Sequence, residues 1–96
     1  MTDIIDKEWI VYIIQTHEGT FYTGITVCLE KRLKEHTHTK KGAKFFRLSQ
    51  PLEVVYKEVV SSRSLASKRE WAIKQMTRKQ KLELIAKNSK VNNEYF

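Results

Sequence analysis

Arg32 and His36 lie one helical turn apart in a segment whose apolar residues have helical spacing. Leu29 and Leu33 are four residues apart, which places them on one face of an amphipathic helix. With about 100° between successive residues, Arg32 and His36 both fall at the border of that face. An arginine there could bind a phosphate while the histidine moves a proton. Alternatively, the arginine extends to solvent and the histidine bonds a backbone carbonyl.

A single carboxylate, Glu70, lies among the seven Lys and Arg residues of segment 63–81. Helical spacing over 64–76 places it beside the apolar side of the predicted helix. It could form an ion pair with Lys74 at i+4, or it could bind a hard metal ion through its carboxylate oxygens. Trp71 lies on the far side of this helix, and we expect it to pack against another element rather than to stack on a base.

Two tyrosines, Tyr12 and Tyr22, lie in consecutive segments that are predicted to form a β-hairpin. The loop length decides whether they share a face, because side chains alternate along a strand. A two-residue turn at 18–19 would put them on opposite faces. A three-residue loop at 17–19, with Gly19 left-handed, would put Tyr12 opposite Gly24 and both tyrosines on one face. Gly24 would then leave a space beside the phenol that a ligand or another backbone could approach.

A small number of elements must position these candidates. β-branched and aromatic runs predict strands, and apolar residues at helical spacing predict helices. Thr77 with Gln80 has the pattern of a capping box that begins a new helix. The predicted order ββαβαα favours an α/β sandwich with a small, mainly antiparallel sheet, in one domain at 1–88 followed by a loose tail at 89–96. The segments are strands at 9–15, 20–26 and 52–60 and helices at 29–36, 64–76 and from 77 to near Asn88.

The chain of 96 residues has a formal net charge of +7, and the positive charge is concentrated in two blocks. Residues 31–47 and 63–81 each sum to +6, whereas residues 1–30 sum to −4. This excess predicts a polyanionic partner, and the two blocks would form one basic groove if the fold brings them together. The sequence has no apolar run of membrane-spanning length, no signal-peptide pattern and a single cysteine, Cys28, so we expect a cytoplasmic protein without a membrane partner.

Taken in order, these residues resemble the GIY-YIG nuclease superfamily, in particular its small, stand-alone bacterial single-domain branch. Arg32 and His36 match the pair on its first helix, and Glu70 matches the metal-binding glutamate of a later helix. The remaining matches are short segments. The two family signatures are matched by Ile10-Val11-Tyr12, with isoleucine in place of the first glycine, and by Tyr22-Thr23-Gly24. The bacterial branch is resembled by three further segments, Gly42-Ala43-Lys44, Arg63-Ser64-Leu65-Ala66 and Arg69-Glu70-Trp71.

The resemblance implies an α/β/α sandwich around a three-stranded antiparallel sheet, and cleavage of phosphodiester bonds with one divalent ion, Mg²⁺ or Mn²⁺. Tyr12 or Tyr22 would be the general base or orient the attacking water. Arg32 would neutralise the scissile phosphate, His36 would assist proton transfer and Glu70 would hold the metal. A phenol has a pKa of about 10, so its ionisation at neutral pH would need positive charge from the basic blocks. The residues expected to contact nucleic acid are Gly24, Lys40, Lys41, Lys44, Arg47 and Arg63.

Three functions are compatible with this pattern. The first is a metal-dependent endonuclease that acts on DNA, with a role in DNA repair or processing. The second is a nucleic-acid-binding module with vestigial catalytic residues, for which the charge alone would suffice. The third is a subunit that tethers a partner nuclease through Trp71 or the tail. Cleavage that needs both a divalent metal and Glu70 separates the first function from the other two.

Overall fold

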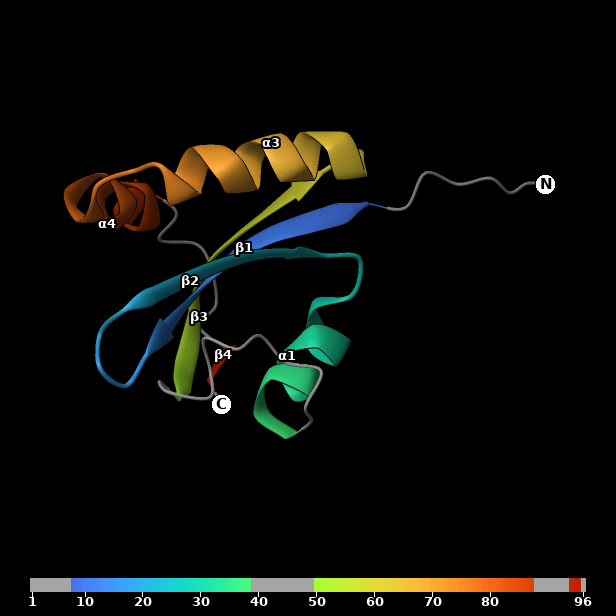
Figure 1. Ribbon diagram of the computed structural model, residues 1–96. Coiled ribbons are helices and arrows are strands. Elements are labelled where there is room, and N and C mark those ends of the chain that lie inside the picture. The colour runs from blue at the N-terminus through green and yellow to red at the C-terminus, as the bar shows by residue number, and fades with distance from the viewer. Residues whose placement is uncertain (1–7, 39–49, 88–93, 96) are drawn as a thin grey trace.

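The computed structural model describes residues 8–38, 50–87 and 94–95 of the chain. The predicted element order ββαβαα is confirmed, with each element within a few residues of its expected bounds. Figure 1 shows a sheet with helices on both of its sides. The elements are β1 (Trp9–Thr16), β2 (Phe21–Thr26), α1 (Leu29–His38), β3 (Pro51–Val60), α3 (Arg63–Lys74), α4 (Arg78–Lys87) and β4 (Glu94–Tyr95).

The sheet has the strand order β2-β1-β3-β4, and every neighbouring pair is antiparallel. The first three strands are the antiparallel core that the family resemblance implied. β4 adds a fourth, two-residue strand, in which Tyr95 pairs with Glu53 and Glu94 pairs with Val54. The expectation of a loose tail over 89–96 is therefore wrong for residues 94–95. Two residues are too few to show an alternating pattern, and the open edge of β3 supplies their backbone partners.

The β1–β2 hairpin has the three-residue loop at 17–19. Gly19 has a positive φ of 87°, the left-handed conformation that glycine adopts without a steric penalty. The resulting register pairs Tyr12 with Gly24 and Ile14 with Tyr22. Both tyrosines therefore lie on the same face of the sheet, as the three-residue alternative predicted, and the two-residue turn is excluded.

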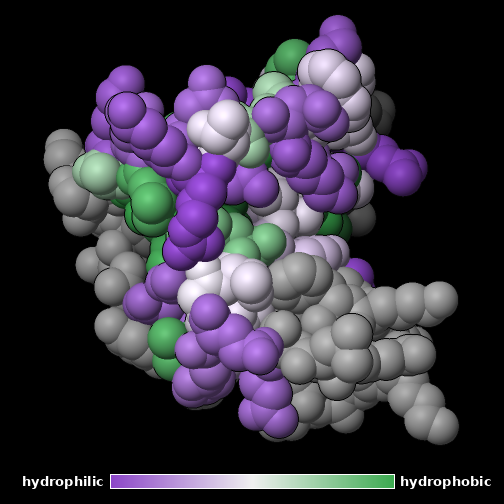
Figure 2. All heavy atoms as spheres, turned by 60° about the vertical axis from the view of Figure 1, so that its left-hand side comes forward, coloured by the Kyte–Doolittle hydropathy of each residue, from purple (hydrophilic) through white to green (hydrophobic). Residues whose placement is uncertain are grey.

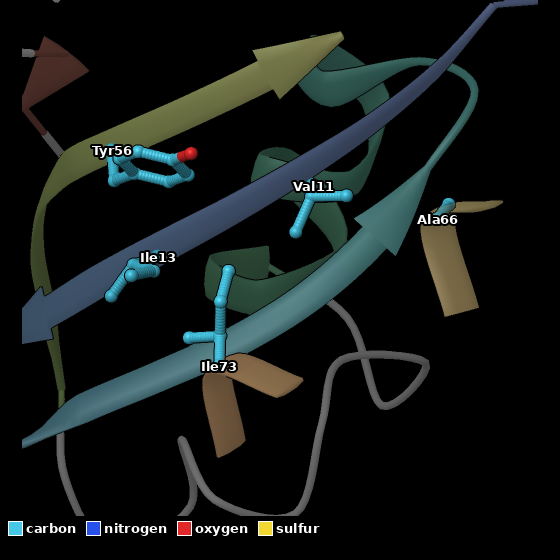
Figure 3. Close-up of a cluster of buried hydrophobic side chains, with 5 residues drawn as sticks. All are labelled: Val11, Ile13, Tyr56, Ala66 and Ile73. Carbon is cyan, nitrogen blue, oxygen red and sulfur yellow. The ribbon is translucent and has the colours of Figure 1, made fainter. Parts of the chain in front are cut away.

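One face of the sheet packs against α3. Val11 and Ile13 of β1 are fully buried there, together with Tyr56 of β3 and with Ala66 and Ile73 of α3. Figure 3 shows these five side chains over the sheet, with Ala66 and Ile73 on the parts of α3 that are drawn. The residues of α3 that meet the sheet recur at helical spacing, so this cluster is the larger core of the protein.

The opposite face of the sheet packs against α1. Tyr12 and Ile14, the alternate residues of β1, are buried there with Val54 of β3 and Leu29 of α1, and Leu33 packs against this cluster. Since successive side chains of a strand point to opposite sides, α1 and α3 must lie on opposite faces of the sheet. Figure 1 shows this three-layer arrangement, which is the α/β/α sandwich that the resemblance implied.

Ten residues of β3 lie opposite eight of β1, because two register shifts interrupt their pairing. At the first shift Ile13 pairs with Tyr56 whereas Ile14 pairs with Val54, which leaves Val55 as the extra residue of a β-bulge. In a regular strand Val54 and Tyr56 would share a face. With the bulge, Val54 enters the α1 core and Tyr56 enters the α3 core. The second shift lies between Gln15 and Thr16.

Both later helices begin at capping side chains. The Ser62 hydroxyl accepts a hydrogen bond from the Leu65 N–H at 3.2 Å and caps α3. At α4, the Thr77 hydroxyl accepts from the Gln80 N–H at 3.2 Å, and the Gln80 side chain accepts from the Thr77 N–H at 2.9 Å. This reciprocal pair confirms the predicted capping box. No helix within the described ranges is long and apolar enough to cross a membrane.

Arg78, the first residue of α4, ties that helix to the β1–β2 hairpin. Its guanidinium donates a hydrogen bond to the Gly19 carbonyl oxygen at 2.9 Å. The same group lies 4.8 Å from the centre of the Phe21 ring, a cation–π distance. Arg78 thus contacts the loop that sets the register of the two tyrosines.

Candidate active site

A buried hydrogen bond joins Tyr12 of β1 to His36 of α1. The phenolic oxygen lies 2.9 Å from Nε2 of the imidazole. Tyr12 has no exposed surface and His36 is 6% exposed. Tyr12 comes from the central strand on the α1 side of the sheet, and His36 projects from the core-facing border of α1, as its spacing from Leu29 predicted. The alternative in which a backbone carbonyl satisfies His36 is thus not needed to explain its burial.

Tyr22 completes an aromatic cluster around this pair. Its ring centre lies 6.3 Å from that of Tyr12 and 5.5 Å from that of His36, which it meets edge to face. A Cβ on Gly24 would lie 2.6 Å from the Tyr12 oxygen and 3.1 Å from the Tyr22 ring. Gly24 therefore makes room for the two tyrosines themselves. The space beside the phenol, which a ligand or another backbone could have approached, is filled by the Tyr12 ring.

Arg32 lies one turn before His36 and approaches the same cluster. Its guanidinium donates to the Glu35 carboxylate at 3.0 Å, and its side chain is 28% exposed. Arg32 also acts on Tyr12: burial raises the pKa of the phenol, and the nearby guanidinium lowers it in part. Arg32 is thus held between a carboxylate and the buried tyrosine while it still reaches solvent, a position that suits a phosphate-binding arginine.

The buried pair is uncharged at neutral pH. Burial, and next the charge of Tyr22, raise the pKa of Tyr12 well above its ordinary value. Burial, followed by the charge of Arg32, lowers the pKa of His36 to about 4. The expectation that neighbouring cations make the phenol ionise does not hold for the protein by itself, because desolvation outweighs Arg32. The two neutral groups share a hydrogen bond in which either one can be the donor, depending on the imidazole tautomer.

Glu70 lies on α3 and thus beyond the sheet from α1. Its carboxylate pairs with Lys74 at 3.4 Å, which is the ion pair that the spacing allowed. Three-quarters of the Glu70 side chain is nevertheless covered, and its charge raises the pKa of Tyr12. Glu70 is thus near enough for its charge to act on the phenol, although α3 and α1 pack on opposite faces of the sheet. Arg32 and Glu70 act on the pKa of Tyr12 in opposite directions.

The donor set fits one kind of metal site. Among residues 8–38, 50–87 and 94–95, no group of three or more His, Cys, Asp and Glu side chains could enclose an ion. Glu70 would hold a metal as a single carboxylate, which suits Mg²⁺ because that ion keeps most of its waters and binds the phosphates of a substrate. Lys74, whose side chain is half exposed, would release the carboxylate when the ion binds.

The basic blocks reach this site only in part. Arg63 begins α3 and lies 5.8 Å from the Trp9 ring centre, so it is not part of the tyrosine cluster. The described cations of the first block belong to α1 and those of the second to α3 and α4, on opposite faces of the sheet. They do not form a single groove. The other predicted nucleic-acid contacts, Lys40, Lys41, Lys44 and Arg47, lie outside the described residues.

The partner of Arg32 and the environment of Trp71 differ from what the sequence predicts. The ion pair of Arg32 with Glu35 at 3.0 Å was not predicted. The i,i+3 spacing of the two residues could have indicated this pair. Trp71 was expected to pack against another element, but it is 67% exposed. That prediction is wrong, because α3 meets the sheet through Ala66 and Ile73, and Trp71 points away from it.

Two tyrosines on one face of the hairpin thus lie beside an arginine and a histidine one turn apart on α1, and a glutamate lies on α3. The chain belongs to the GIY-YIG catalytic domain family, which it matches over residues 8–83. This is a family of nucleases, so the resemblance noted in the sequence is confirmed.

Its relatives are small bacterial proteins. The chain is 45% identical over 82 residues to a UPF0213 protein of Desulfotalea psychrophila, an alignment that covers 85% of this chain and 74% of the relative. It is 40% identical to the UPF0213 protein YhbQ of Escherichia coli, covering 84% and 80% of the two chains. Among solved structures it resembles the solution NMR structure of the UPF0213 protein BH0048 from Bacillus halodurans, with a TM-score of 0.56, 31% identity and coverage of 84% and 85%.

Proposed function

We propose that this protein is a divalent-metal-dependent endonuclease that hydrolyses phosphodiester bonds in DNA, in DNA repair or processing. The observation that carries the proposal is the buried Tyr12–His36 hydrogen bond, with Tyr22 against it and Arg32 beside it. Hydrolysis of a phosphodiester needs a path for the proton of the attacking water and a cation for the phosphate charge. This cluster contains both within one face of the sheet.

The tyrosines and His36 supply the proton path. Tyr22 is partly exposed whereas Tyr12 is fully buried, so we assign Tyr22 to orient the attacking water. A proton that reaches the Tyr12 oxygen can pass along the 2.9 Å hydrogen bond to His36 Nε2. The charge of Arg32 contributes to the low pKa of His36. An anionic phosphate bound to Arg32 would offset that charge and so make His36 a better proton acceptor.

Arg32 binds the phosphate by exchanging its partner. In the free protein its guanidinium is held by Glu35 at 3.0 Å. A guanidinium has five N–H donors, so it can bind phosphate oxygens while it keeps its contact with Tyr12. When Mg²⁺ or Mn²⁺ is bound at Glu70, the ion would supply Lewis-acid stabilisation of the phosphate charge. Glu70 itself contributes a negative charge close to the cluster, which helps to attract that ion.

The experiment is a metal-dependent cleavage assay. Plasmid, single-stranded and branched DNA are incubated with the wild-type protein and with Glu70→Ala, each with Mg²⁺, with Mn²⁺ and with EDTA. The matched control is Glu83→Ala, which removes an exposed carboxylate from the neighbouring helix α4. We expect nicking by the wild type and by the control in the presence of metal, and its loss in Glu70→Ala. Equal cleavage by the wild type and Glu70→Ala would identify a contaminant and reject the proposal.

A nucleic-acid-binding module with vestigial catalytic residues is the second candidate. The net charge of +7 favours it, as do the ion pairs that occupy both Arg32 and Glu70 in the free protein. Such a module would bind DNA with an affinity that falls steeply with added salt, and Glu70→Ala would leave its function intact. Replacement of Lys40, Lys41 and Lys44 by alanine would lower affinity in either case. Only the nuclease also loses metal-dependent cleavage in Glu70→Ala.

A further inference from the structure

Trp71 is a surface residue that the fold does not explain. It is 67% exposed, the highest value among the large hydrophobic side chains in the described part of the chain. A tryptophan usually buries most of its large ring, so one left in water on a helix indicates a surface that meets something else. Trp71 belongs to neither of the two core clusters of the described residues.

The side chains around Trp71 are cationic. Residues three positions apart are neighbours on a helix surface, so Lys68 and Lys74 flank the indole on its two sides along α3. Both lysines are exposed. Figure 2 shows hydrophilic side chains gathered over the upper part of the molecule, where α3 and α4 lie. Apart from Glu70, every charged residue from Arg63 to Lys81 is a cation, so this surface repels basic partners and attracts polyanions.

This patch is continuous with the candidate active site. Lys74 follows Trp71 by three residues, and its Nζ lies 3.4 Å from the Glu70 carboxylate. Trp71, Lys74 and Glu70 therefore occupy adjacent positions of one helix surface. A strand whose phosphate is held by a metal ion at Glu70 would pass Lys74 and then the indole.

We propose that Trp71 stacks on an unpaired base of the DNA strand that is bound at Glu70, with Lys68 and Lys74 receiving the phosphates on either side of that base. This rests on the proposed function. Lys68 and Lys74 are six residues apart, about 9 Å along the helix axis, and the indole lies midway between them. An exposed ring between two cations is the arrangement by which proteins bind single strands, because every base has a face that can stack and every nucleotide carries a phosphate. A paired base cannot stack in this way, so the substrate must contain unpaired nucleotides at this point.

The test uses the fluorescence of Trp71 in the full-length chain. A Trp9→Phe background leaves Trp71 as the sole tryptophan. Ca²⁺ is added in place of Mg²⁺ to fill the metal site, and gel electrophoresis afterwards checks that the oligonucleotide is intact. Titration with a thymidine oligonucleotide should quench the emission saturably, and a blunt duplex of the same length should quench it far less. Trp71→Ala should raise the Kd for the oligonucleotide about 5- to 150-fold, whereas Trp71→Phe should stay near the wild type. Leu82→Ala, which removes another exposed apolar side chain from α4, is the control and should change little.

The outcomes are distinguishable. Binding detected by fluorescence anisotropy without quenching of Trp71, or an unchanged Kd in Trp71→Ala, would overturn the inference. Quenching that depends on protein concentration in the absence of DNA would also overturn it, in favour of an interface between two copies. Quenching by the oligonucleotide in a protein that never cleaves DNA with Mg²⁺ or Mn²⁺ would support base stacking and overturn only the nuclease assignment.

Discussion

Replacement of Gly24 by alanine tests the packing on which the candidate site depends. The added Cβ would lie 2.6 Å from the oxygen and 2.7 Å from Cζ of Tyr12, closer than van der Waals contact allows. Tyr12 is fully buried and cannot turn outward. Its ring must therefore move away from residue 24, which disturbs the hydrogen bond to His36.

The expected cost combines three effects. Overpacking of a well-packed core costs about 1–3 kcal/mol, and loss of the Tyr12–His36 hydrogen bond costs about 1 kcal/mol. Alanine is more favourable than glycine within a strand by about 0.5–1 kcal/mol, which offsets part of this. We therefore expect Gly24→Ala to lower the free energy of unfolding by about 1–3 kcal/mol. For a domain of this length, whose total stability is of the order of 5–14 kcal/mol, that loss is readily measured.

The assay is urea unfolding followed by circular dichroism, together with the ¹⁵N chemical shifts of the His36 ring. Tyr12→Phe removes the atom that lies nearest the new Cβ, so Gly24→Ala should cost less in that background, by at least about 0.5 kcal/mol. Gly24→Ala with wild-type stability and unchanged His36 shifts would falsify the close packing of Gly24 against Tyr12. Equal costs in the two backgrounds would show that the hydroxyl does not contribute to the clash, which the ring carbons would then account for.

Three further predictions concern charge and capping. The pKa of His36 is lowered in the folded protein, so the unfolded chain takes up the imidazole proton at a higher pH than the folded chain does. The free energy of unfolding should therefore fall by about 3 kcal/mol as the pH drops from about 6.5 to about 4. Urea titrations at pH 7 and pH 4.5 should show this fall, and His36→Gln should abolish it. Glu35→Gln should release Arg32 from the Glu35 carboxylate and tighten binding of inorganic phosphate by about 1.5- to 5-fold, measured by NMR of the Arg32 side chain. Weaker phosphate binding would instead show that Glu35 holds the guanidinium in its binding position. Thr77→Ala should cost about 1 kcal/mol in thermal unfolding, because it removes one half of the capping box, and Thr77→Ser should restore most of that loss.

Local rules were sufficient where one short stretch of sequence decides the outcome. The three-residue loop with Gly19 sets the hairpin register, so the opposition of Tyr12 and Gly24 could be predicted as one of two alternatives. Thr77 and Gln80 are close in sequence, so their capping box was visible directly. Helical periodicity placed His36 at the core-facing side of α1 because the apolar stripe is read from the same few residues.

Features that depend on distant segments could not be predicted in this way. The partner of the His36 ring is on a strand 24 residues away, and the spacing within α1 does not identify it. The exposure of Trp71 depends on which residues of α3 meet the sheet, since several of its faces carry apolar side chains. The separation of the two basic blocks follows from the face on which each helix packs, which net charge does not specify.

The unequal lengths of β1 and β3 determine where a residue of β3 can be deleted. β3 has two residues more than its pairing with β1 requires, and Val55 is one of them. Deletion of Val55 would leave a continuous ladder from Trp9 to Gln15, in which Val54 and Tyr56 keep their present sides of the sheet. Deletion between Tyr56 and Val60, where the pairing is continuous, would turn the residues on one side of the gap to the wrong face. We therefore expect the fold to tolerate deletion of a residue at the bulge, because the side chains of β3 would still face the same core clusters as before.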